Sequence, residues 1–576
     1  MNGKNRRTKG CWTRGYPKPG SITSLNIPPQ SPYYNLPTFS SSLKSNLIND
    51  TQRNLVNFFE AYSYVEKTEE YSYNSNTSYA IINLRNSHFT NGTVRITKPG
   101  IYVLQENITF HPNETNDFMP TAAQISSGLY PVGENGAYQL GFFASITVET
   151  NLGVIIDLNG KTIQQSVLHD LQQRFYANIE LAGAPFIPNQ GPAPFSSDST
   201  FKTSDQVLVM NGTLGLSSHH GIHGNQMSRV ILKNLTVKNF EVAGIALNGA
   251  TNSILDTITI KDTLLNVRVL SSFSQSRFIR PFLTTVANRE TSPTFNSLTM
   301  STIQNNLINA LDAAKTAVMA GNTPSNMFGN PDFAEGYDGN VYGLVLNVNG
   351  VVVNDFITTR PGDAIGNENI YMENISISNI ISKPIEIIAL NNDVPGSGAY
   401  GGGRQVGPAG DVLDIHKITD SDKYNGNVLS DAQMIIAKYN APKVGKTNIK
   451  TEIVDWAENN NNNTDLTDVM NANSYYFVTA GDSMGHFMKG NIGMFISAGK
   501  NIKMKNYTIN NVVNHGDTFE DISLQNPGHI AETAPGGNSY GMAIVGSTSI
   551  TESGTNTITN ITKTNGVSMA RDKFQP

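Results

Sequence analysis

The chain has 576 residues, and 15% of them are charged, against roughly 25% in an average soluble protein. Asn, Thr, Ser and 50 glycines stand in place of the missing charges. This composition argues against a helical enzyme or a coiled coil, because both need many Glu, Lys, Ala and Leu residues. It favours an all-β fold, since it is rich in strand formers and turn formers. The single cysteine, Cys11, excludes an internal disulfide framework.

The N-terminal segment differs in charge from the rest. Residues 1–49 contain seven Lys or Arg and no acidic residue, so a charge of +7 stands against −13 elsewhere in a chain of net charge −6. Together with its prolines, this predicts a basic, Pro-rich flexible arm over residues 1–60 and a folded domain over 61–570. A solvated tail, an arm that docks on an acidic partner, and a cleaved targeting segment remain open. The sequence shows neither a membrane span nor the apolar segment of a secretory signal.

An internal repeat organises the folded domain. The phrase VILKNLTVKN, which begins at Val230, returns 23 residues later as SILDTITIKD. NIYMENISISN (369–379) and NIKMKNYTINN (501–511) match the same phrase position by position. Apolar and polar residues alternate over four or five positions, which is typical of strands with one buried face. One unit cannot bury that face alone, so we expect the units to stack as parallel strands.

The repeated phrase carries an asparagine at a fixed position. We expect this residue to lie in a bend, because Asn tolerates the left-handed conformation, and its amide can pair with the unit above. Stacked amides also explain the low charge, since like charges repeated every 5 Å or so would repel one another. The asparagines at this position are Asn211, Asn234, Asn374 and Asn506.

Three further phrases carry a family resemblance: PGIYVLQENITF (99–110), VIIDLNGKTI (154–163) and VLVMNGTL (207–214). With the repeat, they resemble the right-handed parallel β-helix, or pectin-lyase-like, group, including uncharacterised β-helix proteins of large DNA viruses. The resemblance implies one right-handed parallel β-helix with coils of about 23 residues. It leaves function open, because the group contains polysaccharide lyases and hydrolases, phage tailspikes, adhesins and inert viral proteins.

Three segments interrupt the repeat and are predicted to be excursions from the stack, at about 164–204, 264–340 and 390–490. The middle one contains a helical pattern from Ser297 to Gly321. Excursions from a rigid scaffold are common places for binding residues.

The densest group of functional residue types is SSHHGIHGN, with His219, His220 and His223. Its Gly221-Ile222 is the step of the repeat, which returns as Gly244-Ile245. In an extended strand His219 and His223 are about 13 Å apart, too far to share one metal ion. We therefore expect a solvent-facing histidine ladder, and the sequence predicts no metal site and no cofactor.

The catalytic pattern of the polygalacturonase relatives is not reproduced. They present paired aspartates followed by Gly-His-Gly, whereas here His220-Gly221 comes first and Asp363 comes later without a second aspartate beside it. A lyase or hydrolase site would have to be assembled from residues on or near the excursions. The candidates are Asp363, Asp393, Arg404, Asp482 and His486.

The sequence therefore favours a non-catalytic structural or surface protein. By resemblance we expect a virion component at the particle surface, displaying a β-helix to glycans or to other virion proteins. A polysaccharide lyase or glycoside hydrolase is one alternative, and an adhesin-like carbohydrate-binding module is another. The basic arm would suit an acidic partner, and a homo-oligomer remains open.

Overall fold

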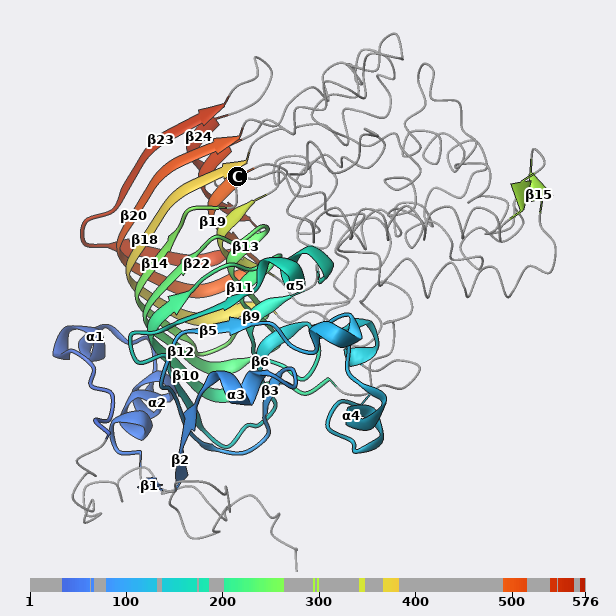
Figure 1. The fold of residues 1–576 in the computed structure, drawn as a ribbon. Helices are drawn as coiled ribbons and strands as arrows, with labels where there is room; N and C mark the ends of the chain where they lie inside the picture. Colours follow the sequence, from blue (N-terminus) through green and yellow to red (C-terminus); the bar gives the residue numbers. More distant parts are fainter. Residues whose placement is uncertain are drawn as a thin grey trace, which may run out of the picture.

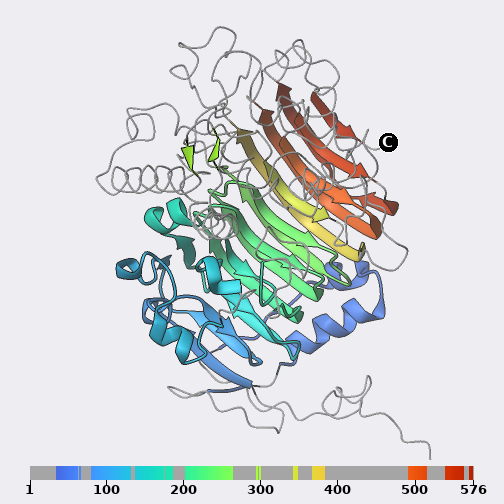
Figure 2. The ribbon, with the colours of Figure 1, turned by 90° about the vertical axis from the view of Figure 1, so that its right-hand side faces the viewer.

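The computed structural model describes most of the repeat and part of its surroundings. The described residues are 34–62, 64–66, 79–131, 137–173, 176–185, 201–263, 294–295, 298–299, 341–347, 366–382, 491–514, 539–545, 547–563 and 570–574. In this part the chain alternates between two long parallel sheets, so the predicted all-β class and the stacking of repeats are confirmed. Figures 1 and 2 show the strands stacked from the blue N-terminal end to the red C-terminal end.

The larger sheet, sheet A, has 13 strands. In spatial order they are β1 (Tyr64–Glu66), β2 (Tyr79–Leu84), β4 (Gly100–Leu104), β7 (Val154–Asp157), β10 (Asp205–Leu214), β12 (Ser228–Lys238), β14 (Ile254–Lys261), β18 (Asn367–Ser382), β20 (Gly499–Asn514) and β22 (Thr548–Ser553). Beside this row lie β5 (Ile108–Phe110), β8 (Thr162–Gln165) and β23 (Thr557–Lys563).

The smaller sheet, sheet B, has nine strands. They are β3 (Val94–Ile96), β6 (Ala144–Val148), β9 (Ala177–Glu180), β11 (His220–Asn225), β13 (Ala243–Asn248), β17 (Tyr342–Asn347), β19 (Asn491–Ser497), β21 (Ser539–Val545) and β24 (Ala570–Phe574). A separate antiparallel pair joins β15 (Thr294–Phe295) and β16 (Leu298–Thr299).

Short helices lie beside the sheets. The α-helices of the described residues are α1 (Ser41–Asn46), α2 (Asp50–Glu60), α3 (Asn86–Phe89), α4 (Ala122–Ser126) and α5 (Val167–Gln172). Two 3-10 turns cover Glu114–Asn116 and Ala137–Leu140.

The strand register follows the phase of the sequence repeat. Val207 pairs with Val230, and Ile231 pairs with Ile254, which are both offsets of 23 residues. Across the interruptions, Ile258 pairs with Ile375 and Ile375 with Tyr507, as the matched phrases predict. The repeat therefore fixes which residues become neighbours, even where long insertions separate them.

The asparagine prediction is also confirmed. Asn211, Asn234, Asn374 and Asn506 have φ between 51° and 60°. The side chain of Asn234 donates to Asn211 Oδ1 at 3.1 Å, and that of Asn506 donates to Asn374 Oδ1 at 3.3 Å. The amides thus bond along the stack, while the left-handed residues bend the strands of sheet A.

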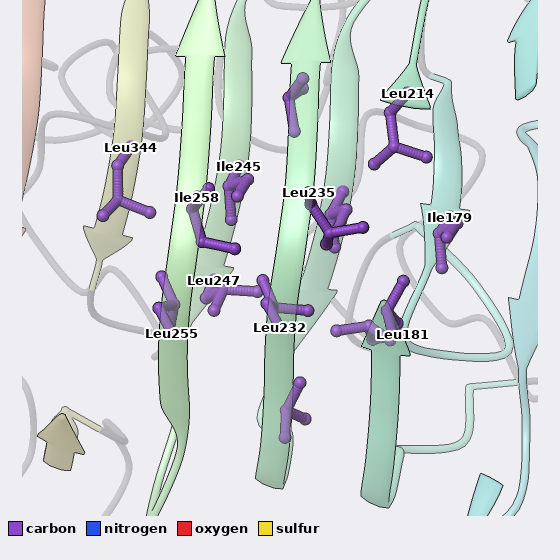
Figure 3. Packing of buried hydrophobic residues seen from close by; sticks show 14 of the residues in the cluster. Ile179, Leu181, Leu214, Leu232, Leu235, Ile245, Leu247, Leu255, Ile258 and Leu344 are labelled. Carbon is purple, nitrogen blue, oxygen red and sulfur yellow. The ribbon is translucent and has the colours of Figure 1, made fainter. Parts of the chain in front are cut away.

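The core lies between the two sheets. Leu232 and Leu235 of sheet A and Ile245 and Leu247 of sheet B are fully or almost fully buried and face each other across the stack (Figure 3). Successive repeats add the same kinds of residue to the same columns. Each repeat therefore buries its apolar face against its neighbours, as expected for units that are not stable alone.

Residues 34–62, hereafter the strap, fold against the face of sheet A that points away from sheet B (Figure 1). Ser40 caps α1 and Asn49 caps α2, each accepting a hydrogen bond from a backbone N–H. Leu55, Val56 and Phe59 of α2 are at most 2% exposed. They pack in one cluster with side chains of sheet A: Ile81, Ile101, Val103, Ile155, Leu208, Met210, Ile231, Ile254 and Tyr371.

The strap connects repeats that are far apart in the sequence. Tyr62 donates its hydroxyl hydrogen to the carbonyl oxygen of Gly153 at 2.8 Å. The side chain of Gln52 donates to the carbonyl of Asn369 at 2.8 Å, and Lys503 Nζ donates to the carbonyl of Asn46 at 3.0 Å. One short segment thus contacts repeats along much of the length of sheet A.

Two predicted boundaries differ from the structure. The flexible arm expected over residues 1–60 is folded from residue 34 to residue 60, while residues 1–33 lie outside the described part. The excursion expected at 164–204 is shorter, because β9 (Ala177–Glu180) is a strand of sheet B. Leu298–Thr299, inside the predicted helix, form β16, and the rest of that helix lies outside the described residues, as does the 390–490 excursion.

Candidate functional site

The five catalytic candidates of the sequence are not placed by the structure. Asp363, Asp393, Arg404, Asp482 and His486 all lie outside the described residues. The described part contains a different concentration of ionisable groups, built around the histidines of β11.

The three histidines are buried, which corrects the solvent-facing ladder expected for them. His219, His220 and His223 are 8%, 2% and 5% exposed. His220 pairs with Ala243 and His223 pairs with Ala246. Both alanines belong to an apolar cluster that is separate from the core between the sheets, so the two histidines lie on the opposite face of sheet B from Ile222. The prediction failed because the alternation was taken as buried against solvated, whereas both faces of sheet B are buried here.

A glutamate meets the histidines from the preceding repeat. Parallel pairing of β9 with β11 places Glu180 beside His223, and His223 Nδ1 lies 2.6 Å from Glu180 Oε2. On its other side, His223 Nε2 lies 3.3 Å from Asn248 Nδ2. The amide nitrogen is a donor, so Nε2 accepts, and the ring hydrogen on Nδ1 is donated to the glutamate.

The histidine rings form a short stack. The ring centroids of His220 and His223 are 5.0 Å apart with an angle of 19° between the ring planes. The ring of His219 lies 4.0 Å from that of His220. Three imidazoles and one carboxyl therefore share a small volume with little solvent.

Burial sets the protonation of this cluster. Loss of solvent raises the pKa of Glu180, and the neighbouring His223 opposes this rise. Loss of solvent, together with His219 and His223, lowers the pKa of His220 well below its ordinary value. His220 is therefore neutral near pH 7 and lies beside the hydrogen-bonded pair of Glu180 and His223. Among the described residues, no group of three or more His, Cys, Asp or Glu side chains has the arrangement of a metal site.

Acidification is expected to weaken the fold through His220. Its folded pKa lies below the ordinary 6.5, so as the pH falls through about 6.5 the unfolded chain binds a proton that the folded chain does not. The stability is present above this pH and is lost below it, by up to about 1.4 kcal/mol per pH unit. Glu180 has the opposite sign, because a raised carboxyl pKa favours the fold at low pH and loses that contribution as pH rises.

Urea unfolding between pH 5 and 7 measures this effect. His220→Asn should give a shallower loss of unfolding free energy below pH 6.5 than the unchanged chain. His88, which is exposed, provides the control as His88→Gln. An equal change of slope in the control would contradict the assignment to His220.

The histidine cluster belongs to a longer column on this face of sheet B. The paired residues are, in spatial order, Arg95, Thr147, Glu180, His223, Ala246, Val345, Phe495, Ala543 and Phe574. Arg95 binds Glu149 through two hydrogen bonds of 2.8 and 2.7 Å. The column is therefore polar and ionisable in its N-terminal part and apolar from Ala246 onward.

Sheet A carries a second ionic column, beneath the strap. Lys233, Asp256, Glu373 and Lys505 are consecutive neighbours by strand register. Lys233 Nζ lies 2.7 Å from Asp256 Oδ2, and Lys505 Nζ lies 2.8 Å from Glu373 Oε1. Each carboxylate is thus neutralised by its own lysine, which allows two like charges to stand side by side.

Both lysines of this column also contact the strap. Lys505 Nζ donates to Ser42 Oγ at 2.9 Å, and Lys233 Nζ lies 5.4 Å from the centre of the Phe39 ring. The column therefore joins repeats to one another and to the strap. Sequence reasoning missed it because it treated stacked charges only as repulsive.

The comparisons with known proteins add no relative. No family model matches the chain, and no curated protein or solved structure matches it significantly. Within the described residues, no helix has the length and apolar character needed to cross a membrane.

Proposed function

We propose that this chain is a structural or surface protein whose stacked repeats form a scaffold that does not cleave polysaccharides. The two sheets would be faces of a right-handed parallel β-helix, and the scaffold would present its polar surface to a glycan or to a partner protein. A place in a virus particle is proposed from the sequence resemblance. The six cations of residues 1–33, without any acid, suit contact with an acidic partner.

The ion pairs between the acidic and basic residues on sheet A support this proposal. Asp256 and Glu373 are adjacent carboxyl groups on a sheet, the kind of pair that glycosidic cleavage requires. Both are at most 6% exposed, each is bound to a lysine, and both lysines contact the strap. Buried ion pairs that join neighbouring repeats beneath the strap stabilise a scaffold, and they keep these carboxyl groups away from a polysaccharide.

A polysaccharide panel tests the proposal on the full chain. Uronate and neutral polysaccharides are incubated with the protein while unsaturated-product absorbance, new reducing ends and bound protein are followed. We expect retention on a glycan or partner surface with neither product formed. Turnover that disappears in Asp363→Asn or His486→Ala would instead establish the lyase or hydrolase alternative.

A further inference from the structure

A serine, a histidine and a glutamate meet at the ends of two neighbouring strands. β5 pairs with β8 in parallel, and Phe110 lies opposite Gln165. His111 and Ser166, the next residues of each strand, therefore leave the sheet side by side, and the Ser166 N–H donates to the carbonyl oxygen of Phe110 at 2.9 Å. The register of the stack thus places these two side chains together although 55 residues separate them.

The three side chains form a hydrogen-bonded chain. Ser166 Oγ lies 2.8 Å from His111 Nδ1, and His111 Nε2 lies 3.0 Å from Glu114 Oε2. A carboxylate accepts a hydrogen bond, so Glu114 holds the ring hydrogen on Nε2 and leaves Nδ1 as the acceptor for the serine hydroxyl. This is the proton order that a serine nucleophile needs from its base.

The loop that carries His111 and Glu114 has a strained backbone. Asn113, Asp117 and Phe118 have φ of 49°, 57° and 56°. A left-handed conformation is costly for a bulky residue such as Phe, and it persists only where the surroundings enforce it. Phe118 is 1% exposed, and its ring lies 5.0 Å from that of His111, so the strained residue supports the imidazole.

Hydrogen bonds hold the same loop in place. The side chain of Asn113 donates to the carbonyl of Met119 at 3.0 Å and to Gln124 Oε1 at 2.7 Å. The Ser166 hydroxyl oxygen accepts from the His169 N–H at 3.1 Å, which fixes the serine as the cap of α5. Both the base and the nucleophile are therefore positioned before any substrate arrives.

The group is open to solvent on one side. The side chains of His111 and Glu114 are 33% and 49% exposed, whereas Ser166 is 9% exposed. The imidazole and the carboxylate are thus reached by solvent, and the serine lies beside them at the buried edge of the group.

We propose that Ser166, His111 and Glu114 hydrolyse small acyl esters. Ser166 Oγ bonds to the carbonyl carbon while its proton passes to His111 Nδ1. The bond to the leaving alkoxide breaks, and the alkoxide takes that proton and departs as an alcohol. Water, deprotonated by His111, then attacks the acyl-serine, releasing the carboxylic acid and restoring Ser166. Glu114 is a positioning residue that orients His111 by accepting the hydrogen on Nε2.

Labelling of the full chain by a fluorophosphonate, with mass mapping of the modified residue, and hydrolysis of p-nitrophenyl acetate test this activity. We expect time-dependent modification at Ser166. Ser166→Asn keeps a good helix cap while removing the nucleophile, so it should remain folded and lose labelling and hydrolysis. His111→Gln should lower kcat by about 100-fold or more. Glu114→Gln should lower kcat with little change in KM.

Ser40 provides the matched control, because it caps α1 through a 3.0 Å hydrogen bond in the same way. Ser40→Asn should leave labelling and hydrolysis unchanged. Absence of labelling in the folded full chain, modification at another residue, or hydrolysis that survives Ser166→Asn would overturn the proposal. These outcomes are independent of polysaccharide binding, so failure here and failure of the scaffold role are distinguishable.

Discussion

Removal of residues 1–62 is expected to leave a chain that aggregates or unfolds far more readily than the full protein. The deletion takes away the strap and exposes the apolar side chains of sheet A that it covers, among them Ile155, Leu208 and Ile254. An apolar face of this kind on a parallel sheet is a site of association when it is uncovered. Dye binding to exposed apolar surface, light scattering and the urea midpoint measure the effect.

Point variants within the strap test whether its buried side chains stabilise the fold. Phe59 is fully buried, so Phe59→Ala should lower the unfolding free energy by about 3–5 kcal/mol. Arg53 lies on the same helix in an exposed pair with Asp50, so Arg53→Ala should change it by no more than about 0.5 kcal/mol.

Deletion of residues 1–33 alone retains the strap and should leave the urea midpoint near that of the full chain. A deletion of residues 1–62 that stays monomeric with an unchanged midpoint would contradict the role given to the strap.

The repeat could be predicted in detail because it is a local pattern copied along the chain. Matching Val230 with Ser253 and its surroundings sets a phase of 23 residues, and the strand register obeys that phase. The αL asparagines were predictable for the same reason, since Asn234 and Asn374 occupy one position of one phrase. Stacking repeats converts sequence periodicity directly into spatial neighbours.

The strap could not be predicted in this way, because its partners follow no period. Asn46 contacts Lys503, more than 450 residues away. Most prolines and all the excess cations of the predicted arm lie in residues 1–33, whereas the strap has one proline and two cations balanced by two acids. The composition of the arm as a whole therefore suggested a free tail and concealed the segment that docks on the sheet. The apolar residues Leu55, Val56 and Phe59 of α2 were the available signal, since they fall on one face of a helix.

The burial of the histidines could be predicted from the residues that the repeat stacks on them, and not from the alternation along their own strand. The positions that pair above His223 hold Ala246, Val345 and Phe495, which are residues of a covered face. Glu180 was missed because it lies in a segment assigned to an excursion. The five acidic, basic and histidine candidates of the excursions remain predictions, since they fall outside the described residues.

An alanine in the glycine column of sheet B is expected to be among the most damaging single changes in the chain. Gly221, Gly244, Gly343, Gly493 and Gly541 occupy the same step of successive repeats. A Cβ on Gly343 would lie 2.4 Å from the carbonyl oxygen of Gly493 and 2.6 Å from Ile377 Cγ2. Neither distance is possible for a carbon atom, so the backbone of one repeat must move away from the next.

The pattern of contacts explains why only glycine fits. At each step the added carbon would meet a branched side chain of sheet A, such as Val237 at Gly221 or Ile260 at Gly244. It would also meet the backbone oxygen of the next repeat, which the stacked strands hold in place. Glycine therefore lets the two sheets approach closely enough to exclude voids from the narrow core.

Gly343→Ala is expected to lower the unfolding free energy by at least about 3 kcal/mol, because a packed backbone cannot relax as a side chain can. Urea unfolding gives the measurement. Ile377→Ala in the same chain removes the side-chain contact, and its own cost is measured in the single variant. The double variant should be no more stable than the sum of the two single effects predicts, because the oxygen of Gly493 still blocks the carbon.

Gly160→Asn is the control. Its φ is 70° and nothing lies within 4 Å of an added Cβ, so Asn, which accepts this conformation, should cost no more than about 1 kcal/mol. Restoration by Ile377→Ala, or an equal loss at Gly160, would show that close approach of the repeats is not what requires glycine. A large loss of unfolding free energy in Gly343→Ala alone would show that the close spacing between neighbouring repeats is what requires glycine at this step.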